Sequence, residues 1–207
     1  TAGQALGFNR AILLLADRDR RRLRGRMGVG PGSGEEAGRI WSRISDEAVT
    51  LKDLATRFGA DRRQREPSPM DHVAQSIQVS LDDTSHILTQ CALSKQLIVV
   101  EDARTDPRVR EDFRALIGAD QFVVAPLIAR NETVGVLVAD NLYTGEPVTE
   151  ENLELLAMFA NQAAIAIENA ESYHQIEEEK RHLEQAYRDL AEAQDKLVRS
   201  ERLVAIG

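Results

Sequence analysis

The order of hydrophobic and polar positions changes several times along the first 148 residues, and each change predicts an element. Short runs of alternating or uninterrupted apolar residues are typical of β-strands. They cover residues 10–16, 22–29, 77–81, 96–101, 121–129 and 134–140. The charged turn DRDRR joins the first two runs and RNET joins the last two, which predicts two antiparallel hairpins. The pattern therefore predicts a sheet of about six strands whose neighbours are mostly antiparallel.

Helical spacing of apolar residues fills the gaps between these strands. It covers residues 37–48, 47–58, 84–93 and 106–118. The last of these helices is predicted to begin at Asp106 and Pro107 and to end at Gly118. The segment GADRRQREPSPMD, residues 59–71, combines prolines and a glycine with dense charge, which predicts an exposed loop. Helices placed between mostly antiparallel strands define an α+β domain over residues 1–148.

The chain changes character at Thr149. From there to Gly207 it has no proline and no internal glycine, so one long helix is predicted. Thr149 is a suitable N-cap, and Glu150 and Glu151 suit the positive end of a helix. Through residue 170 the apolar positions are broadly spread, which is typical of a helix packed on a domain. Residues 149–170 are therefore expected to be the last helix of the α+β domain.

From residue 171 onward the apolar positions narrow to a seam with a spacing of seven. The seam residues are Ile176, Leu183, Leu190, Leu197 and Val204, with Ala186 and Ala193 at the complementary position. Such a register is typical of a two-stranded coiled coil, so residues 171–207 are expected to pair with a second copy as a homodimer. A single solvated helix with many charges is the alternative. Glu179 and Ser200 also fall on the seam, and weak packing of this kind suits a helix pair with two nearly equal packings.

The composition limits the partners of the chain. Hydrophobic residues make up 43% and charged residues 29%, which is typical of a soluble domain with a real core. A net charge of −8 argues against nucleic acid or an anionic membrane surface as the main partner. The apolar runs are too short to span a bilayer, so no membrane contact is expected. A single cysteine, Cys91, fits a reducing compartment, and the cytoplasm is the expected location. The chain begins without Met or a signal peptide, as a piece of a longer protein would.

The sequence holds no motif of metal or nucleophilic chemistry. The histidines form no H-E-x-x-H motif, and neither G-x-S-x-G nor a Walker lysine is present. Cys91 lies in an apolar helical segment, so a buried and inert thiol is predicted. No metal site and no catalytic residue are therefore expected in these 207 residues.

The stretch GRMGVGPGSGEEAGRIW, residues 25–41, is rich in glycine and leads into a predicted helix, as phosphate-binding loops do. Its spacing matches neither G-x-G-x-x-G nor the Walker motif. Ser33 and Glu36 form a predicted capping box, and Glu35 and Glu36 place two negative charges where a phosphate would lie. The stretch is therefore interpreted as a turn out of the second strand into a helix that Trp41 anchors.

Two segments carry a resemblance to a known family. The segment VVAPLIARNETVGVLVADNLYTGEPVTEENLELLAMFANQAAIAIENA resembles the C-terminal half of GAF domains, with GFNRAILLL resembling an earlier strand. The resemblance implies a six-stranded antiparallel sheet with helices on both faces. It also implies a small-molecule pocket on one side, roofed by residues 84–94 and 103–118. The candidate pocket residues are His86, Phe113, Phe122 and Asn141.

The ligand is not implied by this resemblance. The N-K-F-D-E set of cyclic-nucleotide GAF domains is not found, Cys91 is not followed by the histidine of bilin-binding relatives, and no histidine is marked as a haem ligand. No cofactor is required, and haem and bilin are not favoured. A ligand-free dimerisation module stays open as an alternative.

The tail RDLAEAQDKLVRSERLVAIG resembles the linker that precedes the phosphoacceptor-histidine helix of bacterial sensor histidine kinases. The resemblance implies a sensory domain that relays a signal through a dimeric helix to a downstream, ATP-dependent histidine-kinase domain in the parent chain. His182 lacks the phosphoacceptor motif. Two alternatives are a GAF module that controls a transcriptional activator or a cyclase and, least favoured, a Cys91-dependent free methionine sulfoxide reductase.

Overall fold

A computed structural model describes residues 7–37 and 68–204 of the chain. By its internal contacts the chain divides into two compact units, Thr1–Ile167 and Glu168–Gly207. The predicted helices over residues 37–48 and 47–58, with Trp41, lie almost wholly outside the described residues.

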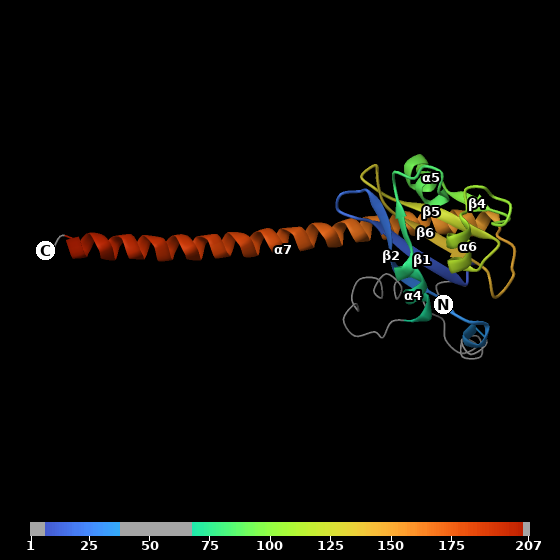
Figure 1. Cartoon of the computed structure of the whole chain (residues 1–207), viewed down its shortest axis with the longest axis horizontal. Helices are drawn as coiled ribbons and strands as arrows, with labels where there is room; N and C mark the ends of the chain where they lie inside the picture. The colour runs from blue at the N-terminus through green and yellow to red at the C-terminus, as the bar shows by residue number, and fades with distance from the viewer. Residues whose placement is uncertain (1–6, 38–67, 205–207) are drawn as a thin grey trace. The chain divides into compact units, whose positions relative to one another are not determined.

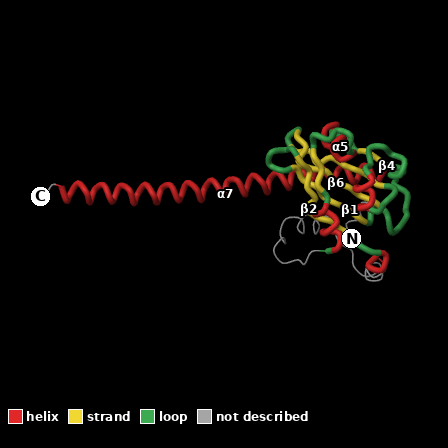
Figure 2. Tube along the Cα trace, in the orientation of Figure 1, coloured by secondary structure: helices red, strands yellow, loops and turns green. Residues whose placement is uncertain are grey.

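The first unit is built on a six-stranded sheet in the order β3-β2-β1-β6-β5-β4 (Figures 1 and 2). The strands are β1 (Arg10–Ala16), β2 (Arg22–Val29), β3 (Gln78–Ser80), β4 (Ile98–Val100), β5 (Phe122–Ala129) and β6 (Glu132–Asp140). Every neighbouring pair is antiparallel. Both predicted hairpins are present, and Arg130 and Asn131 form the second turn with positive φ. The predicted sheet is confirmed.

Helices cover both faces of the sheet, as expected. Because side chains alternate along a strand, Ile12 and Leu14 enter one core and Leu13 enters the other. The first core also holds residues of α4 (Pro69–Ser76), α5 (Ile87–Ser94) and α6 (Glu111–Ile117). The second holds Leu156, Ala160 and Ala164 of α7 (Glu150–Val204). The long helix predicted from Thr149 is therefore present, and the α+β fold with helices on both faces is confirmed.

Three local predictions need correction. Residues 69–71 were expected in a loop, but they begin α4, because Ser68 and Asp71 form a capping box and Pro69 occupies the first turn. The helix expected from Asp106 begins at Glu111 instead. Asp106 forms a local turn, in which its carboxylate accepts a hydrogen bond from the Arg108 amide at 2.9 Å. The helix expected from residue 84 begins at Ile87, since residues 84–86 form a turn.

Two glycines of the opening stretch allow α4 to pack on β2. A Cβ atom at Gly25 would lie 1.7 Å from the Ala74 carbonyl oxygen, and one at Gly28 would lie 2.2 Å from the Met70 carbonyl oxygen. The helix backbone therefore rests directly on the strand backbone, a contact that only glycine permits. The glycines therefore serve the backbone, and Gly25 and Gly28 do so from inside β2.

The helix after this strand is capped by its own side chains, as predicted. The Ser33 hydroxyl accepts from the Glu36 amide at 3.2 Å, and the Glu36 carboxylate accepts from the Gly32 amide at 2.9 Å. The second bond reaches one residue further back than a capping box requires. These amides are thus occupied by side chains of the chain itself.

A buried ion pair joins the end of β6 to the start of β1. The Arg10 guanidinium donates to both carboxylate oxygens of Asp140, and its Nη2 also donates to the Ile117 carbonyl oxygen at 2.6 Å. Burial raises the pKa of Asp140, and the hydrogen bonds from Arg10 oppose that rise. The Arg10 guanidinium also lies 5.5 Å from the centre of the Tyr143 ring. Because Ile117 is the last residue of α6, the pair fixes that helix relative to the sheet.

Candidate sensory face and dimerisation helix

Three of the four candidate pocket residues form one aromatic cluster between α5, α6 and β5. The rings of His86 and Phe113 meet edge to face with centroids 5.1 Å apart, and those of Phe113 and Phe122 do so at 6.0 Å. All three side chains are buried. Phe113 and Phe122 belong to the hydrophobic core of this face, so the cluster fills the space beneath the helices.

His86 also begins α5. Its Nδ1 accepts a hydrogen bond from the Leu88 amide at 3.2 Å, as an N-cap side chain does. Burial lowers the pKa of His86, and Arg110 lowers it further, while Asp83 and Asp112 act in the opposite direction. The neutral ring suits this site, because a protonated Nδ1 can no longer accept the hydrogen bond.

Asn141, the fourth candidate, anchors the loop after β6. Its Nδ2 donates to the carbonyl oxygens of Gly7 at 2.9 Å and Glu146 at 3.1 Å, and its Oδ1 accepts from the Asn9 amide at 3.0 Å. Both amide protons are therefore engaged by the backbone. This side chain holds the start of β1 against the chain that leads to α7.

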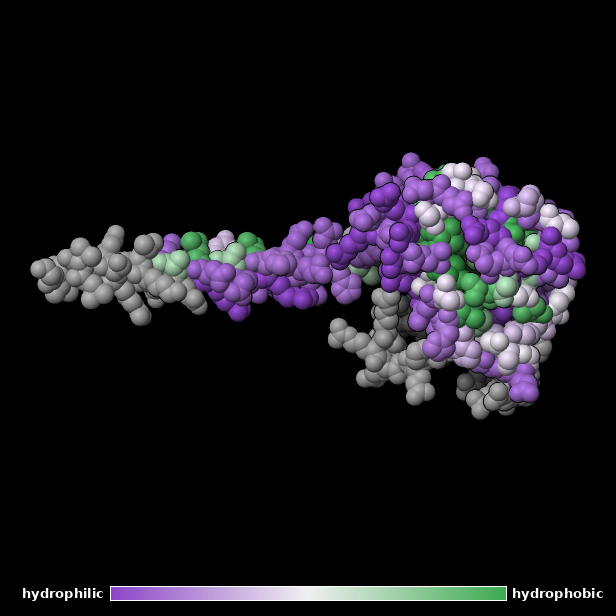
Figure 3. All heavy atoms as spheres, in the orientation of Figure 1, coloured by the Kyte–Doolittle hydropathy of each residue, from purple (hydrophilic) through white to green (hydrophobic). Residues whose placement is uncertain are grey.

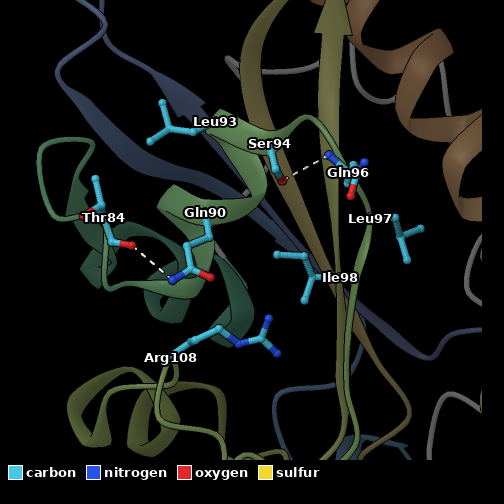
Figure 4. A pocket seen from close by; sticks show the side chains of 8 residues that line it. All are labelled: Thr84, Gln90, Leu93, Ser94, Gln96, Leu97, Ile98 and Arg108. Atoms are coloured by element: carbon cyan, nitrogen blue, oxygen red, sulfur yellow. Dashed lines mark hydrogen bonds between the residues drawn. The ribbon is translucent and has the colours of Figure 1, made fainter.

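An open depression of about 440 Å³ lies beside α5 (Figure 4). It is lined by Thr84, Gln90, Leu93, Ser94, Gln96, Leu97, Ile98 and Arg108. Ile98 points toward α5, and Leu97 points the other way. The four candidate residues are not among the lining residues. The lining does draw on residues 84–94 and on Arg108, which belong to the two segments that the GAF resemblance gives as the pocket roof.

Arg108 is the charged group of this depression, and the sequence did not single it out. Its Nη2 and Nε donate to the two carboxylate oxygens of Asp106 at 2.6 and 2.9 Å. These hydrogen bonds lower the pKa of Asp106 and raise that of Arg108. The side chain is 37% exposed, so part of it still faces solvent. The spacing D-x-R was the available signal, since Asp102 and Arg104 repeat the same pairing.

Cys91 is buried, as predicted. Its side chain is fully covered, and its Sγ lies 3.3 Å from the Gln96 carbonyl oxygen as a hydrogen-bond donor. Burial raises the pKa of the thiol to about 12. A thiol that is both covered and protonated at neutral pH is a poor nucleophile, which counts against a reductase that depends on Cys91.

No group of three His, Cys, Asp or Glu side chains within the described residues is arranged to hold a metal ion. No helix among residues 7–37 and 68–204 is both apolar enough and long enough to cross a bilayer.

The second unit carries the predicted seam on α7. The side chains of Ile176, Leu183 and Leu190 are exposed by 60%, 58% and 54%, and Ala186 and Ala193 are also exposed. Figure 3 shows hydrophobic surface of this kind between hydrophilic stretches of the helix. Leu197 and Val204 lie in the helix, but their side chains are outside the described part.

The polar side chains of the same helix pair with one another. The Arg181 Nη2 atom lies 3.7 Å from Glu177 Oε2, and the Lys180 Nζ atom lies 4.0 Å from Glu184 Oε1. The Gln185 Nε2 donates a hydrogen bond to Asp189 Oδ1 at 2.9 Å. These pairs of residues four apart support the helix itself. These polar pairs do not cover the leucines of the seam, which stay exposed in the single chain.

Comparison with known proteins identifies the first unit. The family model of the GAF domain matches residues 1–167. No curated protein matches the chain. Residues 122–287 of a methyl-accepting chemotaxis protein match with a TM-score of 0.54 at 21% identity, over 81% of this chain and 82% of that chain.

Two further solved structures are similar. The GAF domain of a phosphoenolpyruvate-protein phosphotransferase from Coxiella burnetii gives a TM-score of 0.53 at 15% identity, over 84% and 79% of the two chains. The second GAF domain of DevS from Mycobacterium smegmatis gives a TM-score of 0.50 at 17% identity, over 84% of this chain and 91% of that chain. At such identities these structures support the fold, and the family model supports the family. The chain belongs to the GAF domain family.

Proposed function

We propose that this chain is the sensory part of a two-component sensor histidine kinase. Its GAF domain receives a ligand or a conformational signal, and α7 carries that signal as a dimeric helix to a kinase domain in the parent protein. The observation that carries the proposal is α7 itself, one helix from Glu150 to Val204. It supplies Leu156 and Ala160 to the core of the sheet and bears the exposed heptad seam further along.

This continuity provides a physical route for the signal. A rearrangement in the core shifts residues of the same helix that forms the seam, so the packing of the helix pair responds. The seam suits such a response, because Ala186 and Ala193 alternate with leucine and Glu179 interrupts it. A pair held by weak packing has alternative arrangements of similar energy. Similarity to a chemotaxis protein and the resemblance of the tail to a kinase linker support a role in signalling.

The proposed ligand site is the depression beside α5. Its lining combines three apolar side chains with amides, hydroxyls and the guanidinium of Arg108, which is the mixture that small-molecule sites use. A ligand there would touch α5 and the segment before α6 together. A ligand-free dimerisation module is the second candidate, and the packed aromatic cluster of His86, Phe113 and Phe122 favours it because it leaves that part of the face filled.

The kinase assignment is tested on the full-length parent protein. We expect incubation with ATP to yield phosphate that is labile in acid and stable in base, as phosphohistidine is. The same protein with Leu190→Asp is expected to lose most of this signal, because the paired helix positions the kinase domains. Full-length protein that binds ATP and yields no phosphohistidine would contradict the kinase assignment and favour an activator or a cyclase.

The ligand site is tested by native mass spectrometry of the purified chain. We expect a retained small molecule in the wild-type chain and its loss in Leu93→Trp, because the indole fills the depression from an exposed position. Leu116→Trp, at an exposed position of α6, is the matched control and is expected to retain the molecule. A wild-type chain that always carries only its own mass would favour the ligand-free module.

A further inference from the structure

The β1–β2 hairpin concentrates arginine on an acidic chain. Residues 17–26 hold six arginines and two aspartates, a net charge of +4, whereas the whole chain carries −8. The rest of the chain therefore carries −12. All six arginines are exposed, and the turn of the hairpin projects at one end of the sheet (Figure 1). Charge of one sign gathered in one place creates a local field that attracts ligands of the opposite sign.

Three of these arginines form a strip on β2. Leu23 enters the first core, so its neighbours Arg22 and Arg24 point to the opposite face of the sheet. Arg26 is the extra residue of a bulge between the two strands, and its side chain is also exposed. Alternate residues of a strand lie about 6.8 Å apart. The arginine strip, Arg22, Arg24 and Arg26, is therefore a short row of closely spaced cations on a rigid element.

The arginine strip has no partner of opposite charge in the described part of the chain. Its neighbours in the turn are paired, since Arg20 contacts Glu132 and the Arg21 Nη2 atom lies 3.7 Å from Asp82 Oδ2. The three arginines of the strip form no ion pair with any residue within 7–37 or 68–204. Guanidinium groups at this spacing repel one another, which weakens the sheet slightly. The fold alone therefore gives no reason for this row of charge.

The neighbouring strand extends the polar surface without opposing its charge. Gln78 lies opposite Arg24, and Ser80 lies opposite Arg22. Strand β3 contains no acidic residue, so none of its side chains neutralises the strip. A guanidinium binds a carboxylate through two parallel hydrogen bonds. The surface can thus receive carboxylates about 6.8 Å apart, which is the spacing of alternate residues in an extended peptide.

We propose that the arginine strip binds an acidic segment of a protein partner, an extended stretch with glutamate or aspartate at alternate positions. A short segment meets only the strip, whereas a long nucleic acid or an anionic membrane also faces the −12 of the remaining chain. Residues 16–29 contain no aromatic side chain on which the bases of a single-stranded nucleic acid could stack. This surface shares no residue with the depression beside α5 or with the seam of α7.

The test is fluorescence anisotropy of the purified chain with a short labelled peptide that alternates glutamate and serine. A peptide that alternates glutamine and serine is the uncharged control. The strip variant, Arg22→Gln with Arg24→Gln, removes two charges at exposed positions and is expected to keep the wild-type midpoint of thermal unfolding. The matched control, Arg181→Gln with Arg188→Gln, removes two charges at exposed positions of α7.

At low ionic strength we expect the wild-type chain to bind the glutamate peptide at least about tenfold more tightly than the glutamine peptide. The strip variant is expected to bind the glutamate peptide at least about tenfold more weakly than wild type, and the α7 control to bind it as wild type does. Added salt should weaken the wild-type complex. A glutamate peptide that does not bind, or equal affinities of the strip variant and the α7 control, would overturn the inference.

Two other anions test the class of partner. Polyuridine RNA of the same length as the peptide and vesicles that contain phosphatidylserine are titrated at the same ionic strength. We expect both to bind the wild-type chain more weakly than the glutamate peptide does. Tighter binding of either one, lost in the strip variant, would overturn the acidic protein segment and identify nucleic acid or lipid as the partner of the strip.

Discussion

His86 caps α5 only while its imidazole is neutral, which links the stability of this helix to pH. Burial lowers the pKa of His86 in the folded protein below the ordinary value of 6.5. The unfolded chain therefore takes up a proton as the pH falls through about 6.5, and the folded protein does so only at lower pH. The free energy of unfolding is thus expected to decrease as the pH falls from about 7 toward 5, by at most about 1.4 kcal/mol per pH unit for one proton.

The variant His86→Asn separates the cap from the titration. Asparagine keeps an N-cap acceptor and has no proton to gain, so urea unfolding at pH 7.5 and at pH 5.5 is expected to differ less than in wild type. Loss of the ring contact with Phe113 lowers its stability at both pH values. His72→Asn is the matched substitution at an exposed histidine outside the aromatic cluster. A variant with the full pH dependence of wild type would show that a group other than His86 is responsible.

For single residues, the sequence predicted which side chains lie together better than it predicted their roles. The GAF resemblance led to His86, Phe113 and Phe122, and the structure brings these three together in the core. Their packing depends on α5, α6 and β5, which are distant in sequence, so no local pattern predicts it. Asn141 likewise has partners at Gly7 and Glu146 that only the folded chain brings near. Burial of Cys91 was predictable, because its neighbours along the helix are apolar.

Among the elements, strands were the most predictable, because each short run of alternating or uninterrupted apolar residues is a local signal in the sequence. The helix α4 was missed for a physical reason. Its first turn contains a proline and a charged residue, which are also common in loops. Its position depends on β2, a strand that is distant in sequence. The contact of Gly25 and Gly28 with α4 decides where this helix lies. The capping box of Ser68 and Asp71 was the local signal that could have indicated it.

The packing of α4 on β2 makes a direct prediction. Gly25→Ala places a methyl group 1.7 Å from the Ala74 carbonyl oxygen, so the helix must shift away from the strand. We expect the free energy of unfolding of Gly25→Ala, measured in urea, to be lower than that of wild type by at least about 1–3 kcal/mol. Gly34→Ala is the matched control, because nothing lies within 4 Å of its added methyl group. It lies in a helical turn, where alanine is favoured, so its stability should equal or exceed wild type. Equal stability of the two variants would show that α4 does not rest on Gly25.

At the scale of the whole molecule, two kinds of pattern share one helix. The apolar positions in the first part of α7 are broadly spread, which predicts a helix packed on a domain. The structure agrees, because Leu156 and Ala160 are buried against the sheet. The later part has a narrow seam with exposed leucines. A single chain cannot bury that seam along its own helix, so the sequence predicts the need for a partner without defining its arrangement.

The variant Leu190→Asp tests whether the seam holds two chains together. A charge in the middle of a leucine seam is expected to convert the dimer to a monomer in sedimentation velocity, because a buried, unpaired carboxylate is costly. Gln185→Asp adds the same charge off the seam and is expected to remain dimeric. It replaces the hydrogen bond to Asp189 by a like-charge pair four residues apart, a helix cost of about 0.5 kcal/mol or less. Both variants should keep the wild-type midpoint of thermal unfolding for the GAF domain, because Leu190 and Gln185 lie in the second unit. A monomeric wild-type chain at high concentration would instead favour the single solvated helix, and the signal would then need a route other than a helix pair.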